Sequence, residues 1–375
     1  HLKDLTLEDP GNAREAIMEG QSVVNFGFSS PLGLDRNPAV QQAIIDGMRH
    51  WGTQNTISRS FASAEICKRV ERRLADWLGV EDTMVVRSVS IANIGAIPAI
   101  CGPDTLLAVD QFSHTSIWEA SKIAQADGVE VQKFDAAVKG SLEKVARKRG
   151  NRRLVVAIDG VYSMLGTTPP LQEVYEIAKR HDGVLYVDDA HGTGAVGPGG
   201  RGAAFEVLGS VNDIVLAGSL SKAFGCVGGF LTCTHALKLI LKMKNFAYIF
   251  CGPVPSPYLA GVEAALDILE SPAFDALISR LQHLIHRLTS GLDAAGIRHF
   301  GNVSPIVAIP IGDIEETLKA GRYLFDRGYY VPSVTYPAVP INGGLLRIQV
   351  SANNQEGSID GLVAAIAEMK ESLKL

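Results

Sequence analysis

The alternation of short apolar runs with helical patterns between about residues 65 and 250 is the feature that most restricts the fold of this chain. Runs rich in Val, Ile and Leu predict buried strands at 83–86, 106–110, 129–134, 154–159, 184–189 and 213–218. The segments between them have helical spacing: within 65–79, for example, Ile66, Val70 and Leu74 fall on one helix face. Repeated βα units of this kind predict an α/β fold with a mostly parallel sheet, covered by helices on both faces.

The length of 375 residues exceeds one ordinary hydrophobic core, so we expect a large domain and a smaller one. The segment 251–261 carries three prolines and indicates a break between them. We therefore predict a large domain over 45–255 and a small α+β domain over 256–375. The segment 1–44 is expected to join the small domain.

The composition argues against several classes of function. The formal net charge of −5, with lysine and arginine scattered along the chain, gives no basic surface for nucleic acid. No run of about eighteen apolar residues predicts a membrane helix. The five cysteines show no CxxC spacing, so we expect neither a disulfide framework nor a metal site, and a cytoplasmic setting fits best.

Polar side chains follow several of the predicted strands, where open α/β sheets bind their ligands. Asp188 lies at the end of the run 184–189, and His191 comes three residues later. A carboxylate at the buried end of a strand is costly unless it meets a cation. Asp188 therefore either caps or pairs locally within the protein, or it contacts a charged ligand.

A lysine and a second histidine occupy similar positions. Lys222 follows the run 213–218 among small residues, which suits an amine that forms a Schiff base, although a surface lysine would look similar. His114 follows the run 106–110 and is either a capping histidine or a flat plate against a ring.

One ligand, pyridoxal 5'-phosphate (PLP), would use all of these groups. Lys222 would form the imine, and Asp188 would keep the pyridine nitrogen protonated, an interaction worth about 4 kcal/mol at 4 Å and an effective dielectric constant of 20. PLP would then stabilise negative charge at the Cα of an amino acid. The remaining candidates are His191 and Ser163 for the phenolic oxygen, His114 for the ring face, and Ser219 with the helix start at Val89 and Ser90 for the phosphate.

The segments YVDDAHGTGAVGPGGRG, DGVYSMLG, FSHTS and SLSKAFGCVGG, taken together, resemble the α-oxoamine synthases, which are fold-type I PLP enzymes. The similarity extends from about residue 24 to the end of the chain. It implies a homodimer with its active site at the interface, which condenses an amino acid with an acyl thioester of coenzyme A or a carrier protein. The products would be CO₂, free thiol and an α-aminoketone.

The resemblance also implies roles for individual residues. Lys222, Asp188 and His191 would be catalytic, and Arg347 would bind the substrate carboxylate, a task that suits a guanidinium. Ser30 and Asn93 lie in matching segments and are predicted to contact the substrate.

The sequence departs from the family pattern near the expected substrate. Val89 and Ser90 stand where the family usually has a glycine and an aromatic residue, and Pro31 replaces the tyrosine of an Asn-Tyr-Leu-Gly segment. The identities of the amino acid and the acyl chain therefore stay open. Two other functions also stay open, namely another fold-type I reaction, such as that of an aldolase or aminotransferase, and a non-catalytic scaffold subunit.

Overall fold

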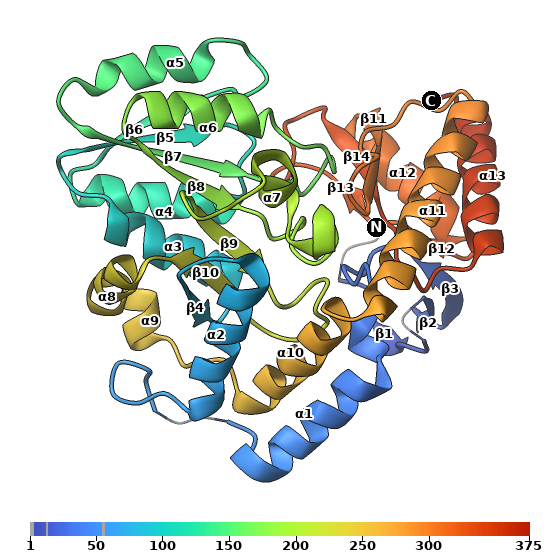
Figure 1. Ribbon diagram of the computed structural model, residues 1–375. Coiled ribbons are helices and arrows are strands. Elements are labelled where there is room, and N and C mark those ends of the chain that lie inside the picture. The colour runs from blue at the N-terminus through green and yellow to red at the C-terminus, as the bar shows by residue number, and fades with distance from the viewer. Residues whose placement is uncertain (1–3, 13, 55–56) are drawn as a thin grey trace. The chain divides into compact units, whose positions relative to one another are not determined.

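The structure is a computed structural model that describes residues 4–12, 14–54 and 57–375 (Figure 1). Its chain divides into two compact units, which are described separately. The larger unit comprises Asn37–Tyr162 and Thr168–Pro272. The smaller unit comprises His1–Arg36, Ser163–Thr167 and Ala273–Leu375.

A seven-stranded sheet forms the centre of the larger unit. In spatial order its strands are β4 (Asp82–Val86), β10 (Gly229–Cys233), β9 (Val215–Ser219), β8 (Val184–Asp188), β7 (Arg153–Asp159), β5 (Thr105–Asp110) and β6 (Glu130–Phe134). All six predicted strands are present, with ends within two residues of those expected, and the prediction of a mostly parallel sheet is confirmed. The sequence reading missed β10, which runs antiparallel to both of its neighbours.

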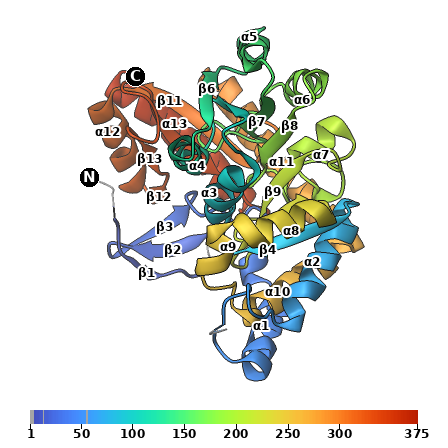
Figure 2. The same cartoon turned by 90° about the vertical axis from the view of Figure 1, so that its left-hand side faces the viewer.

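Helices cover both faces of this sheet. On one face, α3 (Val89–Ile100) and α4 (Thr115–Ala126) share an apolar core with alternate residues of the strands. The other strand residues are buried as well, and α5 (Ser141–Ala146) and α6 (Leu171–Arg180) lie against that opposite face (Figures 1 and 2). Burial on both faces explains why the strands read as continuous apolar runs rather than as an alternating pattern.

The remaining helices of the larger unit surround this core. They are α1 (Pro38–Trp51), α2 (Glu65–Leu78), α7 (Ala203–Leu208), α8 (His235–Lys244), α9 (Phe246–Phe250) and α10 (Ser256–Leu269). The predicted helix over 65–79 is confirmed, and it ends at Gly79, whose left-handed conformation suits a helix C-terminus. Short 3₁₀ turns occur at Leu34–Arg36, Arg147–Arg149 and Pro198–Gly200.

The smaller unit has an α+β arrangement with two small sheets. One sheet has the order β1 (Leu7–Asp9), β2 (Glu15–Met18), β3 (Gln21–Asn25) and β12 (Tyr329–Tyr330). The other has the order β11 (Ile306–Gly312), β14 (Gly344–Gln349) and β13 (Ser333–Val334). The helices are α11 (Pro272–Ala294), α12 (Ile314–Phe325) and α13 (Glu356–Leu373).

The boundaries between the units differ from the expected positions at residues 44 and 255. Both α1 and α10 belong to the larger unit, because they pack together so closely that a Cβ on Gly47 would lie 3.0 Å from the Cβ of Ala260. Arg69 of α2 also forms an ion pair with Glu263 of α10. The prolines of 251–261 do not end the larger unit, since a proline is tolerated in the first turn of a helix such as α10.

Candidate active site

The carboxyl ends of the central strands bring several of the predicted residues to one edge of the sheet. β7 and β8 are parallel, and their register pairs Asp159 with Asp188. β9 lies beside β8 and ends at Ser219, three residues before Lys222. β5 lies on the other side of β7, and His114 follows its end. The strand order therefore gathers a lysine, two carboxylates and an imidazole at this edge.

Asp188 is buried, and its carboxylate is held by N–H donors. Its Oδ2 accepts a hydrogen bond from Nδ2 of Asn93 at 2.6 Å, and its Oδ1 accepts one from the backbone N–H of Ala190 at 3.1 Å. Asn93 also donates to Oγ of Ser116 and accepts from the hydroxyl of Tyr186. The predicted substrate contact of Asn93 does not agree with this placement, since the side chain is fully buried and its polar atoms all bond to protein.

The two strand-end carboxyls interact with each other and with the lysine. The pKa of the buried Asp159 carboxyl is raised well above its usual value, first by burial and next by the neighbouring charge of Asp188. The backbone N–H of His114, 2.9 Å from Oδ1 of Asp159, and the ammonium of Lys222 both act to lower it. Lys222 thus lies within electrostatic range of Asp159, which pairs with Asp188 across β7 and β8.

Lys222 is half-buried on a short connection between two adjacent strands, β9 and β10. The backbone N–H of Leu220 donates to the carbonyl of Gly228 at 3.0 Å, and that of Cys226 donates to the carbonyl of Leu220 at 3.0 Å. Gly228 has a φ of 127°, which a residue with a side chain adopts rarely. The small residues around the lysine therefore serve first to close this connection.

The protein groups that were predicted to bind the phosphate lie on either side of the start of β10. Gly229 pairs with Ser219 at the end of β9, and a Cβ on Gly229 would lie only 2.8 Å from the backbone nitrogen of Val89. The absence of a side chain at Gly229 lets the first turn of α3 approach the sheet. Ser88 caps α3 with its Oγ, and the backbone N–H groups of Val89 and Ser90 open the helix. Ser219 is almost fully buried beside this helix start.

His191 is half-buried in the loop after β8, and the adjacent carboxyl of Asp189 fixes that loop. The Oδ2 of Asp189 accepts from the backbone N–H of Ala204. A Cβ on Gly192 or Gly202 would come within 2.1 and 2.2 Å of its carboxylate oxygens, so glycines are needed around it. Burial raises the pKa of Asp189 to about 7. The glycine-rich loop after β8 closes on itself through an antiparallel bridge between residues 193 and 201.

His114 is half-buried and caps α4 with its own ring. Its Nδ1 accepts from the backbone N–H of Ser116 at 3.2 Å and lies 2.7 Å from Oγ of the same serine. The capping interpretation of His114 is therefore correct, and it leaves the other ring nitrogen open to a further role.

Three of the predicted residues belong to the smaller unit. Arg347 is buried, and its Nε donates to the backbone carbonyl of Ser163 at 2.7 Å. Burial lowers the pKa of this guanidinium to about 10, and no carboxylate of the described residues lies within ion-pair distance. Ser30 is also buried and donates its hydroxyl to Asp35, while its carbonyl accepts from Arg14. The hydroxyl of Ser30, which was predicted to contact the substrate, is thus bonded to Asp35 within the protein.

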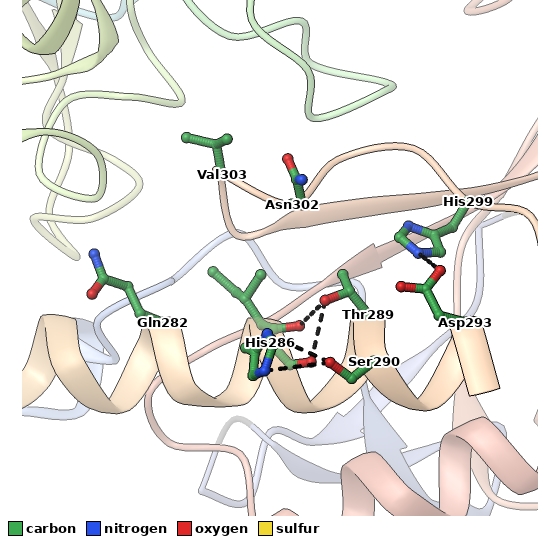
Figure 3. A pocket seen from close by; sticks show the side chains of 9 residues that line it. Gln282, His286, Thr289, Ser290, Asp293, His299, Asn302 and Val303 are labelled. Atoms are coloured by element: carbon green, nitrogen blue, oxygen red, sulfur yellow. Dashed lines mark hydrogen bonds and ion pairs between the residues drawn. The ribbon is translucent and has the colours of Figure 1, made fainter.

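A separate polar pocket of about 310 Å³ lies in the smaller unit (Figure 3). It is lined by Gln282, Ile285, His286, Thr289, Ser290, Asp293, His299, Asn302 and Val303. Its polar groups largely bond to one another or to α11, as in the 3.1 Å contact between Nε2 of His299 and Asp293. None of the residues predicted from the sequence lines this pocket.

Within residues 4–12, 14–54 and 57–375, no cluster of three or more His, Cys, Asp or Glu side chains could hold a metal ion. In the same ranges, no helix is both long and apolar enough to cross a membrane.

Sequence reasoning missed the residues that hydrogen-bond to Asn93, the side chain that in turn donates to Asp188. Tyr186 and Ser116 look like ordinary core and helix-cap residues in the sequence, and only the fold brings them to Asn93. Asp159 is the last residue of the predicted strand 154–159, but its bond to the backbone of His114 depends on the order of β5 and β7.

Comparison with known proteins finds similarity along nearly the whole chain. The family described as Aminotransferase class I and II matches residues 21–366. A putative 8-amino-7-oxononanoate synthase of Desulforudis audaxviator is 33% identical over 366 residues, covering 97% of this chain and 94% of the relative. A serine palmitoyltransferase of Bacteriovorax stolpii is 31% identical, covering 96% of this chain and 85% of the relative.

Solved structures give the same result. A serine palmitoyltransferase from S. paucimobilis with a bound PLP–myriocin aldimine has a TM-score of 0.92 at 27% identity, covering 99% of this chain and 93% of that one. A serine palmitoyltransferase of Sphingomonas wittichii has a TM-score of 0.93 at 25% identity, with the same coverage.

Proposed function

Because the chain belongs to the aminotransferase class I and II family, and within it to the α-oxoamine synthases, we propose that it is a PLP-dependent acyltransferase that condenses an amino acid with an acyl thioester. The products are an α-aminoketone, CO₂ and a free thiol. The acyl donor is a thioester of coenzyme A or of a carrier protein.

The arrangement of Lys222 beside two buried strand-end carboxyls carries this proposal. Burial of Asp159 and Asp188 is costly even with N–H donors, and it is explained if a cation is to be received at this edge of the sheet. The protonated ring nitrogen of PLP is such a cation, and Lys222 supplies the amine that its aldehyde requires. The residues present therefore fit the cofactor.

Each remaining candidate has a matching part of the cofactor. Bound PLP supplies an electron sink for negative charge at the amino acid Cα. His114 covers the ring, and His191 and Ser163 donate to the phenolic oxygen. The phosphate is bound by the hydroxyl of Ser219 and by the helix start at Val89 and Ser90, where backbone N–H groups favour an anion.

The substrate is held and deprotonated by two further groups. Arg347 binds the amino acid carboxylate, because its guanidinium is buried and lacks a carboxylate partner among the described residues. The amine of Lys222 then takes the Cα proton at Nζ. Asp188 would face the ring nitrogen, since Asn93 and Ala190 orient both of its oxygens.

The functional protein is proposed to be a homodimer. Phe61, Met243 and Phe250 of the larger unit are each at least 80% exposed, although large apolar side chains usually favour burial. A second copy of the chain that covers these residues would remove them from water. Sedimentation equilibrium should give twice the chain mass of 40.0 kDa, and a monomer at micromolar concentration would contradict this part.

The free thiols support a reducing, cytoplasmic setting. Cys67, Cys101, Cys226, Cys233 and Cys251 are all unpaired. Fractionation of the producing cell, followed by immunoblotting, tests the location.

Product analysis tests the reaction itself. The purified protein, supplied with PLP, is mixed with each common amino acid and a series of acyl-CoA thioesters, and CO₂ and free thiol are measured. Equal release of both, dependent on both substrates, is the expected result. Transfer of the amino group without CO₂ would instead indicate an aminotransferase, and cleavage of the amino acid alone would indicate an aldolase.

The variant Lys222→Ala is the control for this assay. It should still bind PLP through the phosphate and ring contacts but release neither CO₂ nor thiol. A wild-type protein that binds no PLP would leave only the scaffold function.

A further inference from the structure

Asn93 connects the two groups that would contact the cofactor ring. Its Nδ2 lies 2.6 Å from Oδ2 of Asp188 and 2.8 Å from Oγ of Ser116. Oγ of Ser116 in turn lies 2.7 Å from Nδ1 of His114. One side chain, together with one serine, thus links the carboxylate at the end of β8 to the imidazole that caps α4.

The chemistry of the partners fixes the direction of every bond in this chain. The carboxylate of Asp188 only accepts, so the Asn93 atom facing it must be the amide nitrogen. The hydroxyl of Tyr186 lies 2.7 Å from Oδ1 of Asn93 and donates to it, since burial raises the pKa of Tyr186 far above 10 and keeps it protonated. With its oxygen used, Asn93 directs one N–H to Asp188 and the other to Ser116.

The same reasoning fixes the tautomer of His114. Oγ of Ser116 accepts from Asn93, so its own hydrogen is available for Nδ1 of His114. The backbone N–H of Ser116 also donates to Nδ1, at 3.2 Å. A nitrogen that accepts two hydrogen bonds carries no proton, so the neutral ring has its proton on Nε2.

From this chain of bonds we propose that Asn93 and Ser116 are positioning residues: together they hold His114 as the Nε2–H tautomer and orient the carboxylate of Asp188. The proposal rests on the proposed function, in which these two groups lie against PLP. Tyr186 completes the arrangement by preventing the amide of Asn93 from turning over.

The site thereby gains one hydrogen-bond donor in a fixed position, the Nε2–H of His114. Nε2 of His114 has no hydrogen-bond partner in the part of the chain that the structure describes, so its N–H is available to an acceptor on the substrate or cofactor. The backbone N–H of His114 is held by Asp159 at 2.9 Å, which prevents the ring from shifting with its loop.

A structural role alone accounts poorly for this arrangement. Asn93 and Tyr186 are fully buried, and Ser116 and Asp188 are at most 6% exposed. Apolar residues of similar size would fill this volume without the desolvation cost of an amide, two hydroxyls and a carboxylate. The retained polarity is explained by the orientation that it gives to Asp188 and His114.

Nitrogen-15 NMR of the cofactor-free protein tests the tautomer directly. Histidine is labelled with ¹⁵N, and the His114 signals are assigned by their loss in His114→Gln. At about pH 9, where an imidazole is neutral, the wild type should show a protonated Nε2 and an unprotonated Nδ1. A wild-type ring protonated mainly on Nδ1 would overturn the proposal.

Ser116→Ala and Ser121→Ala form a matched pair for the same measurement. Both serines are buried on α4, but Oγ of Ser121 donates to the backbone carbonyl of Ile117. Ser116→Ala should bring a measurable fraction of the Nδ1–H tautomer, whereas Ser121→Ala should leave the spectrum of His114 unchanged. Ser116→Thr retains the hydroxyl and should restore the wild-type spectrum. Equal effects of the two alanine variants, or no effect of either, would contradict the assigned role.

The hydrogen bond between Asn93 and Asp188, at the other end of this series of bonds, is tested by measuring cofactor affinity. Asn93→Leu keeps the side-chain volume but removes the hydrogen bond to Asp188, so PLP binding should weaken about 10- to 100-fold. Tyr186→Phe, a milder change, should weaken it less, and circular dichroism checks that both variants fold. Unchanged PLP affinity in a folded Asn93→Leu would refute the orienting role.

The two hypotheses fail in different ways. If the wild type takes up no PLP, the proposed function fails, while the NMR result on the cofactor-free protein still reports the tautomer. If PLP binds and turnover occurs but the Ser116 and Asn93 variants behave as wild type, only the positioning roles fail.

Discussion

A buried carboxylate of the larger unit and two buried arginines of the smaller unit are compensated in different ways. At the sheet edge of the larger unit, the carboxylate of Asp188 receives N–H donors on both oxygens, and Lys222 lies nearby. In the smaller unit, Arg14 and Arg347 are buried, and burial lowers the pKa of both to about 10, although the charge of Asp35 acts to raise that of Arg14.

The two arginines differ in how many acceptors they have. Arg14 reaches the backbone carbonyls of Asn25, Phe28 and Ser30 through its two terminal nitrogens, while its buried Nε has no hydrogen-bond partner among the described residues. Arg347 reaches one carbonyl, through Nε, and its two terminal nitrogens have no partner among the described residues. The guanidinium of Arg14 therefore stabilises the fold, whereas that of Arg347 is open to a ligand.

The largest effect is expected from Asp188→Asn. This change removes the charge opposite the ring nitrogen, an interaction of about 4 kcal/mol, so turnover should fall about 1,000-fold. The exchange of the amino acid Cα proton in D₂O, followed by proton NMR, should slow by a similar factor. Normal exchange in this variant would contradict the role of Asp188 as the charge opposite the ring nitrogen.

Arg14→Gln should destabilise the protein strongly without a specific effect on substrate binding. It removes the hydrogen bonds of a buried guanidinium to the carbonyls of Phe28 and Ser30, so the free energy of unfolding should fall by about 2–4 kcal/mol. Urea unfolding measures this change. Full stability together with a raised KM would mean that Arg14, too, acts on the substrate.

Arg347→Gln should show the opposite behaviour. The KM for the amino acid should rise about 10- to 100-fold, since a charge-assisted bidentate bond to its carboxylate is lost. The melting temperature of the substrate-free protein should stay the same or rise, because a buried cation without a counter-ion is removed. A large loss of stability would instead place Arg347 in the same class as Arg14.

The smallest effect concerns Asp189, whose pKa is raised to about 7 by burial. Between about pH 4 and 7 the folded protein binds a proton that the unfolded chain has released, so this group makes stability fall as the pH rises. Urea midpoints measured from pH 5 to pH 8 should therefore decline less steeply in Asp189→Asn than in the wild type. An identical slope would show that the carboxyl titrates in its ordinary range.

The sequence predicted the parts of the fold that depend on local pattern. The six parallel strands and the helix over 65–79 have strong apolar signals, so both their type and their ends agree with the structure. β10 was missed because its apolar run is short and follows a glycine pair that reads as part of a turn. The larger unit extends to Pro272 rather than to 255, because the packing of α10 on α1 is a tertiary contact that no local pattern shows.

The site divides in the same way. Lys222, Asp188 and His114 follow strand ends, so a parallel sheet brings them together without further information. Asn93 was predicted to contact the substrate because its motif matches the family. How far this residue lies from the edge of the sheet, however, depends on how α3 packs. Ser116 and Tyr186 gave no sequence signal, because their significance arises only from a shared neighbour.

The connection that carries Lys222 begins and ends in paired strands. Ser219 and Gly229 lie opposite each other in the sheet, so the main chain is anchored on both sides of the lysine. During the proposed reaction the amine of Lys222 must be released from the cofactor and bind to it again in every cycle. With the backbone fixed in this way, rotation about the four methylene groups of the side chain is sufficient for both steps, and no loop has to refold between one turnover and the next.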